Sequence, residues 1–287
     1  MKKKIAVARL SIISNSALIV LKLTVGIISG SVSIISESIH STIDLLASLI
    51  AFFSVKISGT PPDKEHPYGH GKYENISGVI EGLLIFVAAI WIIIEAVDRF
   101  IHPKPVEAIG LGFIIMVIAS AVNFFVSRKL YKVAKDTDSV ALEADALHLK
   151  TDVYTALGVA AGLLIMLITK IHLFDPLLAI IMALLILKES YVLLKNAFSP
   201  LLDTSLPDEE VKLITSIINE ENVEFHHLRT RKSGDSRFVD FHIELPEKTS
   251  LKDAHEKCDE IENSIKNKLD NIEITIHTET LEGDDGK

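Results

Sequence analysis

Residues 76–100 read ISGVIEGLLIFVAAIWIIIEAVDRF, a stretch that is long and apolar enough to cross a lipid bilayer as a single helix. Similar windows recur along the first 200 residues and predict a bundle of six transmembrane helices. The composition agrees, because 48% of the 287 residues are hydrophobic and the mean hydropathy is +0.36. The six helices are expected at about 7–29, 32–56, 76–100, 108–130, 140–169 and 176–197.

Residues 201–287 differ from the rest of the chain in charge and in hydrophobic period. They hold 22 acidic and 11 basic side chains, a net charge of −11, which leaves +2 for residues 1–200 in a chain of −9. We therefore predict two domains, an all-α transmembrane domain over residues 1–200 and a C-terminal α+β domain over residues 201–287. The tail elements follow the order αββαβ, which is typical of a three-stranded sheet with its helices on one face.

The distribution of Lys and Arg orients the predicted helices across the membrane. One side holds about three basic residues, Arg99, Lys104 and Lys170, whereas the other side holds many more. Because basic loops stay in the cytoplasm, both termini are expected there, in a multi-pass protein surrounded by the lipid of the cytoplasmic (inner) membrane. The more basic side carries Lys2, Lys3, Lys4, Lys56, Lys64, Lys72, Arg128, Lys129, Lys132 and Lys135.

The composition also argues against several kinds of partner and site. An acidic tail is a poor partner for nucleic acid, whose phosphates need a basic surface. The single cysteine, Cys258, excludes a disulfide framework and a thiolate metal site. The sequence has no H-E-x-x-H signature or similar catalytic pattern, so we do not expect an enzyme.

The second and fifth predicted helices carry ionisable residues in one repeated pattern. Residues 37–44 read ESIHSTID and residues 145–152 read DALHLKTD, so both follow acid-x-x-His-x-x-x-Asp. Because residues four apart are neighbours on a helix, each helix presents a histidine beside a carboxylate. A charged side chain in hydrocarbon costs at least ~2.5–3.5 kcal/mol, so two copies of this pattern indicate a shared function.

If these two helices face each other, their side chains form a four-coordinate site of two imidazoles and two carboxylates. Such a site suits Zn²⁺ and accepts neighbouring first-row ions, but it lacks sulfur for Cu⁺ and has too few oxygens for Ca²⁺. The competing interpretation is a set of hydrogen bonds that only holds the helices together. Glu37 and Asp145 could support the ligating histidines, line an access path, or meet water near a helix end. The predicted ligands are His40, Asp44, His148 and Asp152.

Two further groups of residues predict metal binding outside the membrane. In the loop before the third helix, Asp63, His66 and His70 could close on one ion. In the tail, alternation along the strands places His242 and His277 on the polar face of the sheet, where the alternative is a merely solvated surface. The tail supplies His226, His227, His242, His255, His277 and Glu279.

Several segments together resemble the cation diffusion facilitator family, specifically its bacterial zinc and ferrous-iron efflux members. They are HSTID and HLKTD in the helices, HPYGHGKYE in the loop, LLDTSLPDEE entering the tail, and HHLRTRKSG, FHIEL and IHTE within it. The resemblance implies a homodimer with a metallochaperone-like cytoplasmic domain that exchanges a divalent cation for protons by alternating access. It implies a charge interlock between Lys72 and Asp203 and tail sites near the dimer contact, formed by His226, His242, His255, His277 and Glu279.

The sequence departs from this family pattern at two positions. Some close relatives have aspartate at the place of His40, and relatives often have aspartate at the place of Glu279. The additional imidazole favours Zn²⁺ over Mn²⁺, while Fe²⁺, Co²⁺, Cd²⁺ and Ni²⁺ stay open. No cofactor is expected beyond the bound metal. The alternative function is a membrane-bound metal sensor or scaffold that binds ions without transporting them.

Overall fold

The computed structural model describes residues 1–287 except 30–31, 102–110, 170–173 and 282–287, and leaves out the side chains of some helical residues beside these gaps. The described chain forms two compact units, Met1–Phe198 and Ser199–Lys287. Each unit has a buried hydrophobic core of its own.

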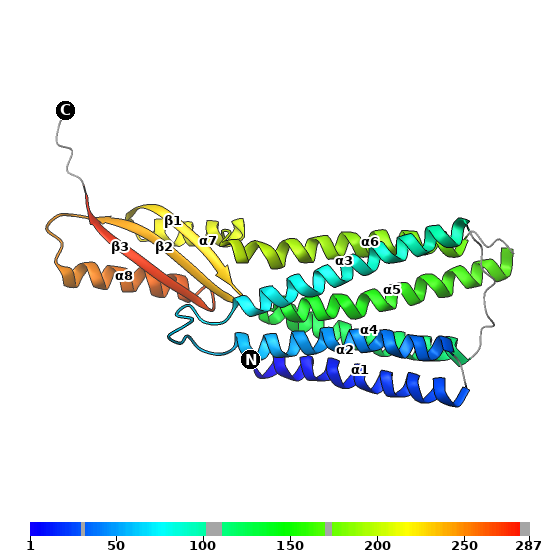
Figure 1. Ribbon diagram of the computed structural model, residues 1–287. Helices are drawn as coiled ribbons and strands as arrows, with labels where there is room; N and C mark the ends of the chain where they lie inside the picture. Colours follow the sequence, from blue (N-terminus) through cyan, green and yellow to red (C-terminus); the bar gives the residue numbers. More distant parts are fainter. Residues whose placement is uncertain (30–31, 102–110, 170–173, 282–287) are drawn as a thin grey trace. The chain divides into compact units, whose positions relative to one another are not determined.

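The first unit contains six long helices within the described residues (Figure 1). Four of them, α1, α3, α4 and α6, are long and apolar enough to cross a membrane by their length and composition. The other two, α2 and α5, are the helices with the repeated acid and histidine pattern, and the side chains of both are described only in part. The bounds are α1 Lys2–Ser29, α2 Val32–Ser58, α3 Lys72–Ile101, α4 Leu111–Thr137, α5 Val140–Thr169 and α6 Phe174–Phe198.

The helices are longer than the apolar windows that predicted them. α3 begins at Lys72, whereas the apolar window starts at residue 76, and α4 continues to Thr137, seven residues past the predicted end at 130. An apolar window marks the part of a helix that fits hydrocarbon, but the backbone stays helical in the polar turns beyond it. A sharp turn then joins α4 to α5, where Asp138 has a positive φ of 51°.

The helices pack in pairs, α1 with α2, α3 with α6, and α4 with α5, and α5 also contacts α2 and α3. Small residues allow the close approach of α3, as is common between membrane helices. A Cβ atom at Gly78 would lie 2.6 Å from Cγ1 of Val140 and 3.0 Å from Cβ of Ala197. One at Gly82 would lie 2.9 Å from the side chain of Leu194 on α6.

The second unit begins with a short 3₁₀ helix, Ser199–Leu202, and then confirms the predicted order αββαβ. The strand order is β1-β2-β3, in which β1 and β2 are antiparallel and β2 and β3 are parallel. Figure 1 shows β2 between the other two strands. The parallel pair needs a crossover, which α8 provides. The bounds are α7 Asp208–Glu220, β1 Glu224–Ser233, β2 Ser236–Leu245, α8 Leu251–Lys266 and β3 Ile272–Thr280.

Both tail helices pack on one face of this sheet. Ile214 of α7 and Ile261 of α8 are fully buried in one cluster with Phe241 and Ile243 of β2. Because successive strand residues point to opposite faces, the residues between them point away from the helices. The polar face of the sheet is therefore the face on which the tail histidines lie.

Candidate metal centres

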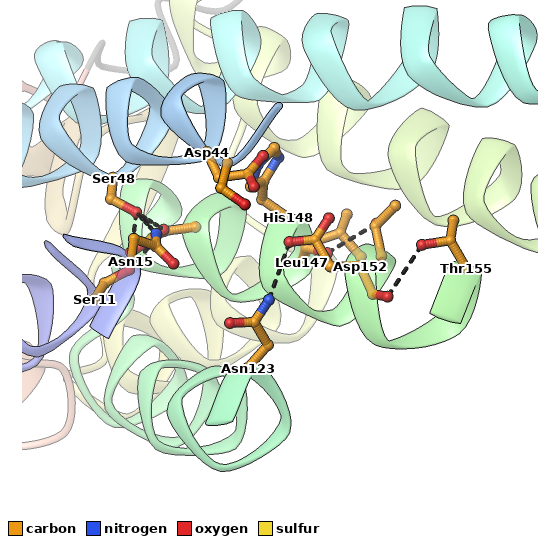
Figure 2. A network of polar contacts seen from close by, with 12 residues as sticks. Ser11, Asn15, Asp44, Ser48, Asn123, Leu147, His148, Asp152 and Thr155 are labelled. Atoms are coloured by element: carbon orange, nitrogen blue, oxygen red, sulfur yellow. Dashed lines mark hydrogen bonds and ion pairs between the residues drawn. The ribbon is translucent and has the colours of Figure 1, made fainter. Parts of the chain in front are cut away.

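The interior of the bundle brings together three of the four predicted transport ligands. Nε2 of His148 on α5 lies 3.1 Å from Oδ1 of Asp44 on α2, and Asp152 follows one turn later on α5 (Figure 2). The ligand atoms of Asp44, His148 and Asp152 all lie within 4.8 Å of one another. His40 belongs to α2, one turn before Asp44, but its side chain lies outside the part that the structure describes.

Asn123 of α4 is a neighbour of this site that the sequence analysis missed. Its Nδ2 donates a hydrogen bond to Oδ2 of Asp152 at 3.2 Å (Figure 2). Its Oδ1 is buried and has no hydrogen-bond partner among the described residues. An amide inside the apolar stretch SAVNFFV was the available signal, because a polar group there needs a partner.

A second polar network ties α1, α2 and α5 together beside the site. Oδ1 of Asp145 accepts hydrogen bonds from the hydroxyls of Ser11, at 3.1 Å, and Ser48, at 3.0 Å. Nδ2 of Asn15 donates to the hydroxyl of Ser48 at 2.7 Å. Asp145 is fully buried, so it does not meet water near a helix end. It supports the packing around the site instead.

The three clustered ligands line a cavity of about 680 Å³ inside the bundle. Its other polar lining residues include Lys22, whose Nζ donates to the hydroxyl of Ser41 at 2.7 Å. The lining comes from the later parts of α1 and α3, the middle of α5, and the earlier parts of α2, α4 and α6. The cavity therefore occupies the half of the bundle where α1 ends and α2 begins.

The opposite half of the bundle is closed by apolar packing and a buried ion pair. Nζ of Lys4 lies 3.0 Å from Oε1 of Glu74, and their side chains are 3% and 2% exposed. The hydroxyl of Ser58 donates to the same oxygen at 2.8 Å, and that of Ser139 donates to the other. The pair thus joins α1, α2, α3 and the turn before α5. Beside it, the core cluster includes Val7, Val55, Leu130, Leu142 and Leu149.

The loop between α2 and α3 gathers all three of its predicted ligands. Nδ1 of His66 lies 3.3 Å from Oδ1 of Asp63, and Nε2 of His70 lies 3.4 Å from Oδ2. The ligand atoms of the three residues lie within 4.8 Å of one another. The backbone N–H of His66 donates to Asp63 and lowers the pKa of that carboxyl, which keeps it ionised for a cation.

The polar face of the tail sheet holds a third group. Glu279 accepts from Nδ1 of His242 at 2.8 Å and lies 3.1 Å from Nε2 of His226, and these three residues offer ligand atoms within 4.8 Å of one another. The hydrogen bond from His242 lowers the pKa of Glu279. His242 stands opposite His277 in the register, which confirms the prediction that the two share a face.

The remaining predicted residues lie around this group or apart from it. Nε2 of His277 is 3.5 Å from Glu279, but His255 on α8 is largely exposed and pairs with Asp259 at 3.6 Å. Asp203 lies 3.5 Å from Arg231, and its interlock with Lys72, which would join the two units, stays a prediction. Glu244 was not predicted as a ligand, although its Oε1 is 3.2 Å from Nδ1 of His226.

Comparison with known proteins identifies the family. Residues 8–202 match the cation efflux transmembrane domain, and residues 206–281 match the cytoplasmic domain of cation efflux proteins. The chain belongs to the cation diffusion facilitator family. It is therefore a cation efflux transporter, embedded in a membrane through several helices, and its family is a class of transporters rather than of enzymes.

Relatives align over nearly the full length of this cation diffusion facilitator. The uncharacterized transporter sll1263 of Synechocystis is 36% identical, over 96% of this chain and 90% of that protein. The cation-efflux pump FieF of Klebsiella pneumoniae is 32% identical, over 91% of this chain and 88% of that protein. The solved metal-bound C-terminal domain of the CzcD transporter from Thermotoga maritima is 32% identical, over 27% of this chain and 98% of that domain, with a TM-score of 0.25.

Proposed function

We propose that this cation efflux transporter exports Zn²⁺ across the cytoplasmic membrane in exchange for protons, as a homodimer with both termini in the cytoplasm. The observation that carries the proposal is the meeting of Asp44, His148 and Asp152 inside the bundle, with ligand atoms within 4.8 Å of one another in a large cavity. Fe²⁺, Cd²⁺ and Co²⁺ are the next candidates, because the same donors bind them.

The chemistry of the donors favours zinc. One imidazole and two carboxylates form a mixed nitrogen and oxygen set, and His40, one turn from Asp44, would supply a second imidazole. Four-coordinate sites of this composition suit Zn²⁺, which has no geometric preference from its d electrons. An all-oxygen shell would instead favour Mg²⁺, Ca²⁺ or Mn²⁺.

The same donors couple the cation to protons. A ligating histidine must be neutral and a ligating aspartate ionised, so metal binding releases protons and protonation releases metal. The 3.1 Å separation between Nε2 of His148 and Asp44 is a hydrogen-bond distance. A proton on Nε2 of His148 therefore forms a hydrogen bond to the Asp44 carboxylate, and a cation bound by Nε2 and Oδ1 displaces that proton.

The position of the cavity supports alternating access. With both termini in the cytoplasm, the half of the bundle that contains the cavity faces outward. The cytoplasmic half is closed by the apolar cluster and by the buried Lys4–Glu74 pair. In this proposal the arrangement represents an outward-facing state, and rearrangement of the helices around the central ligands would open the site to the cytoplasm.

Reconstitution of the purified protein into sealed vesicles tests the proposal. With an acidic lumen, Zn²⁺ is expected to accumulate inside and protons to leave, at a rate that falls when the pH gradient is collapsed. A panel of Fe²⁺, Co²⁺, Cd²⁺, Ni²⁺ and Mn²⁺ ranks the cations. Binding of zinc without flux would favour the sensor or scaffold function instead.

A further inference from the structure

Two consecutive histidines of β1 lie on the same face of the tail sheet, although neighbours on a strand normally point to opposite faces. The register explains this. His226 pairs with His242 and Arg229 pairs with Asp240, so His227 and Leu228 together stand opposite Phe241 alone. This two-against-one arrangement is a β-bulge, which re-aims side chains and recurs next to functional sites.

The backbone at His227 has a conformation that is uncommon outside glycine. Its φ is +53°, in the left-handed region, and the first position of a bulge with this conformation is normally glycine. The other non-glycine residues with positive φ in the described chain are all Asp or Asn, the residues that tolerate it best. A histidine here therefore has a conformational cost that a glycine would avoid, which indicates a use for its side chain.

The bulge places the imidazole of His227 against the tail cluster. Its ring centroid is 4.9 Å from that of His226 and 5.2 Å from that of His242. Meanwhile Leu228 still packs against the hydrophobic core. In a regular strand that starts with Phe225 inward, His227 would point into the core and Leu228 would point away from it. The extra residue therefore keeps Leu228 in the core and adds the imidazole of His227 to the polar face.

We propose that His227 is a further metal ligand, which joins His226, His242 and Glu279 in a four-coordinate site for a zinc-like divalent cation. The ligand atoms of the other three already lie within 4.8 Å of one another. The side chain of His227 is exposed, so it is free to rotate the short distance that separates its ring from theirs. Zinc as the ion rests on the proposed function, whereas the role of His227 as a ligand does not.

Full-length protein that carries D44A and D63A tests this inference, because each substitution removes a carboxylate from one of the other two clusters. The affinity of the tail for Zn²⁺ is measured by competition with a chromophoric chelator. H227G is expected to weaken binding about tenfold or more. The zinc-free protein should unfold at the same or a higher temperature, because glycine fits the positive φ. H227D, which can ligate and tolerates this conformation, should restore part of the affinity.

The matched control is N222G, which relieves the other left-handed residue near β1, with φ of 53°, outside the cluster. It should leave the zinc affinity unchanged. Unchanged zinc affinity in H227G would overturn the inference and leave the bulge with only its role in packing Leu228. Because binding is measured without flux, failure of the protein to transport zinc would refute the proposed function but would leave this result standing.

Discussion

Asp44 of α2 and His148 of α5 meet in the interior of the bundle, with Oδ1 and Nε2 3.1 Å apart and both side chains largely buried. Asp44→Ala or Asp152→Ala is expected to abolish zinc flux and to leave a folded dimer, because each removes a ligand without disturbing the apolar core. Flux in reconstituted vesicles and size-exclusion chromatography provide the measurements.

Glu189→Gln is the control for these aspartate variants. It removes a carboxylate from a partly exposed pair with Lys150, 2.8 Å away, on the neighbouring helix α6. Flux should stay close to that of the unmodified protein. Zinc transport that persists in Asp44→Ala or Asp152→Ala would show that the central cluster does not carry the ion.

Asn123 is expected to position Asp152 for the cation. In Asn123→Ala the carboxylate loses the donor at 3.2 Å, so the KM for zinc should rise about tenfold, with a smaller change in kcat. Initial rates of uptake across a range of zinc concentrations separate the two constants. Asn196→Ala, at an exposed position of α6, is the control. Equal KM values in the two variants would contradict the positioning role.

The buried pair of Lys4 and Glu74 is expected to stabilise the closed half of the bundle in which it lies. Because both side chains are almost fully buried, Glu74→Gln leaves an uncompensated lysine and should cost about 3–5 kcal/mol. The double variant K4M/E74M removes both charges and should recover most of that loss. Thermal unfolding of detergent-solubilised protein measures the effect. A double variant no more stable than Glu74→Gln would argue against an interaction between the two residues.

Acid is expected to weaken the contact between the tail helices. Lys257 of α8 donates to Glu221 at 2.8 Å, which lowers the pKa of the Glu221 carboxyl below its ordinary value of 4.5. The pair therefore stabilises the folded tail above about pH 4.5, and this contribution is lost as the pH falls through the lowered value. The pair is partly exposed, so it contributes only about 0.2–1 kcal/mol to the stability of the folded tail.

Glu221→Gln tests this pH dependence, because the amide cannot titrate. Pulse proteolysis of the tail at a series of pH values should show the variant less stable than the unmodified protein at neutral pH. The difference should shrink as the pH falls below 4.5. A constant difference over the whole range would mean that the Glu221 carboxyl is not the titrating group.

The sequence predicted the elements of this fold because their signals are local. Apolar windows located six helices, and the alternation along β2 and β3 placed His242 and His277 on one face. The sequence also predicted the central ligands Asp44, His148 and Asp152. Ionisable residues are costly in hydrocarbon, and their helical spacing places them on one face of each helix. Lys72 was wrongly placed in the preceding loop, since polarity marks the edge of the membrane and not the start of α3.

Contacts between distant segments were not predictable in the same way. Nothing in the sequence links Lys4 to Glu74, 70 residues later, or Asn123 to Asp152, because neither pair belongs to one periodic pattern. The bulge did leave a signal. The inward residues Phe225 and Leu228 are three apart, which breaks the period of two and marks one extra residue between them.

Gly78 and Gly82 have a consequence for motion within the membrane. A Cβ at Gly78 would collide with Val140 of α5 and Ala197 of α6, and one at Gly82 with Leu194 of α6, so α3 has little room to turn against either helix. We therefore expect α3, α5 and α6 to move together. His148 and Asp152 of α5 belong to this group of helices and Asp44 of α2 does not, so a shift of α2 against the group would open or close the cation site.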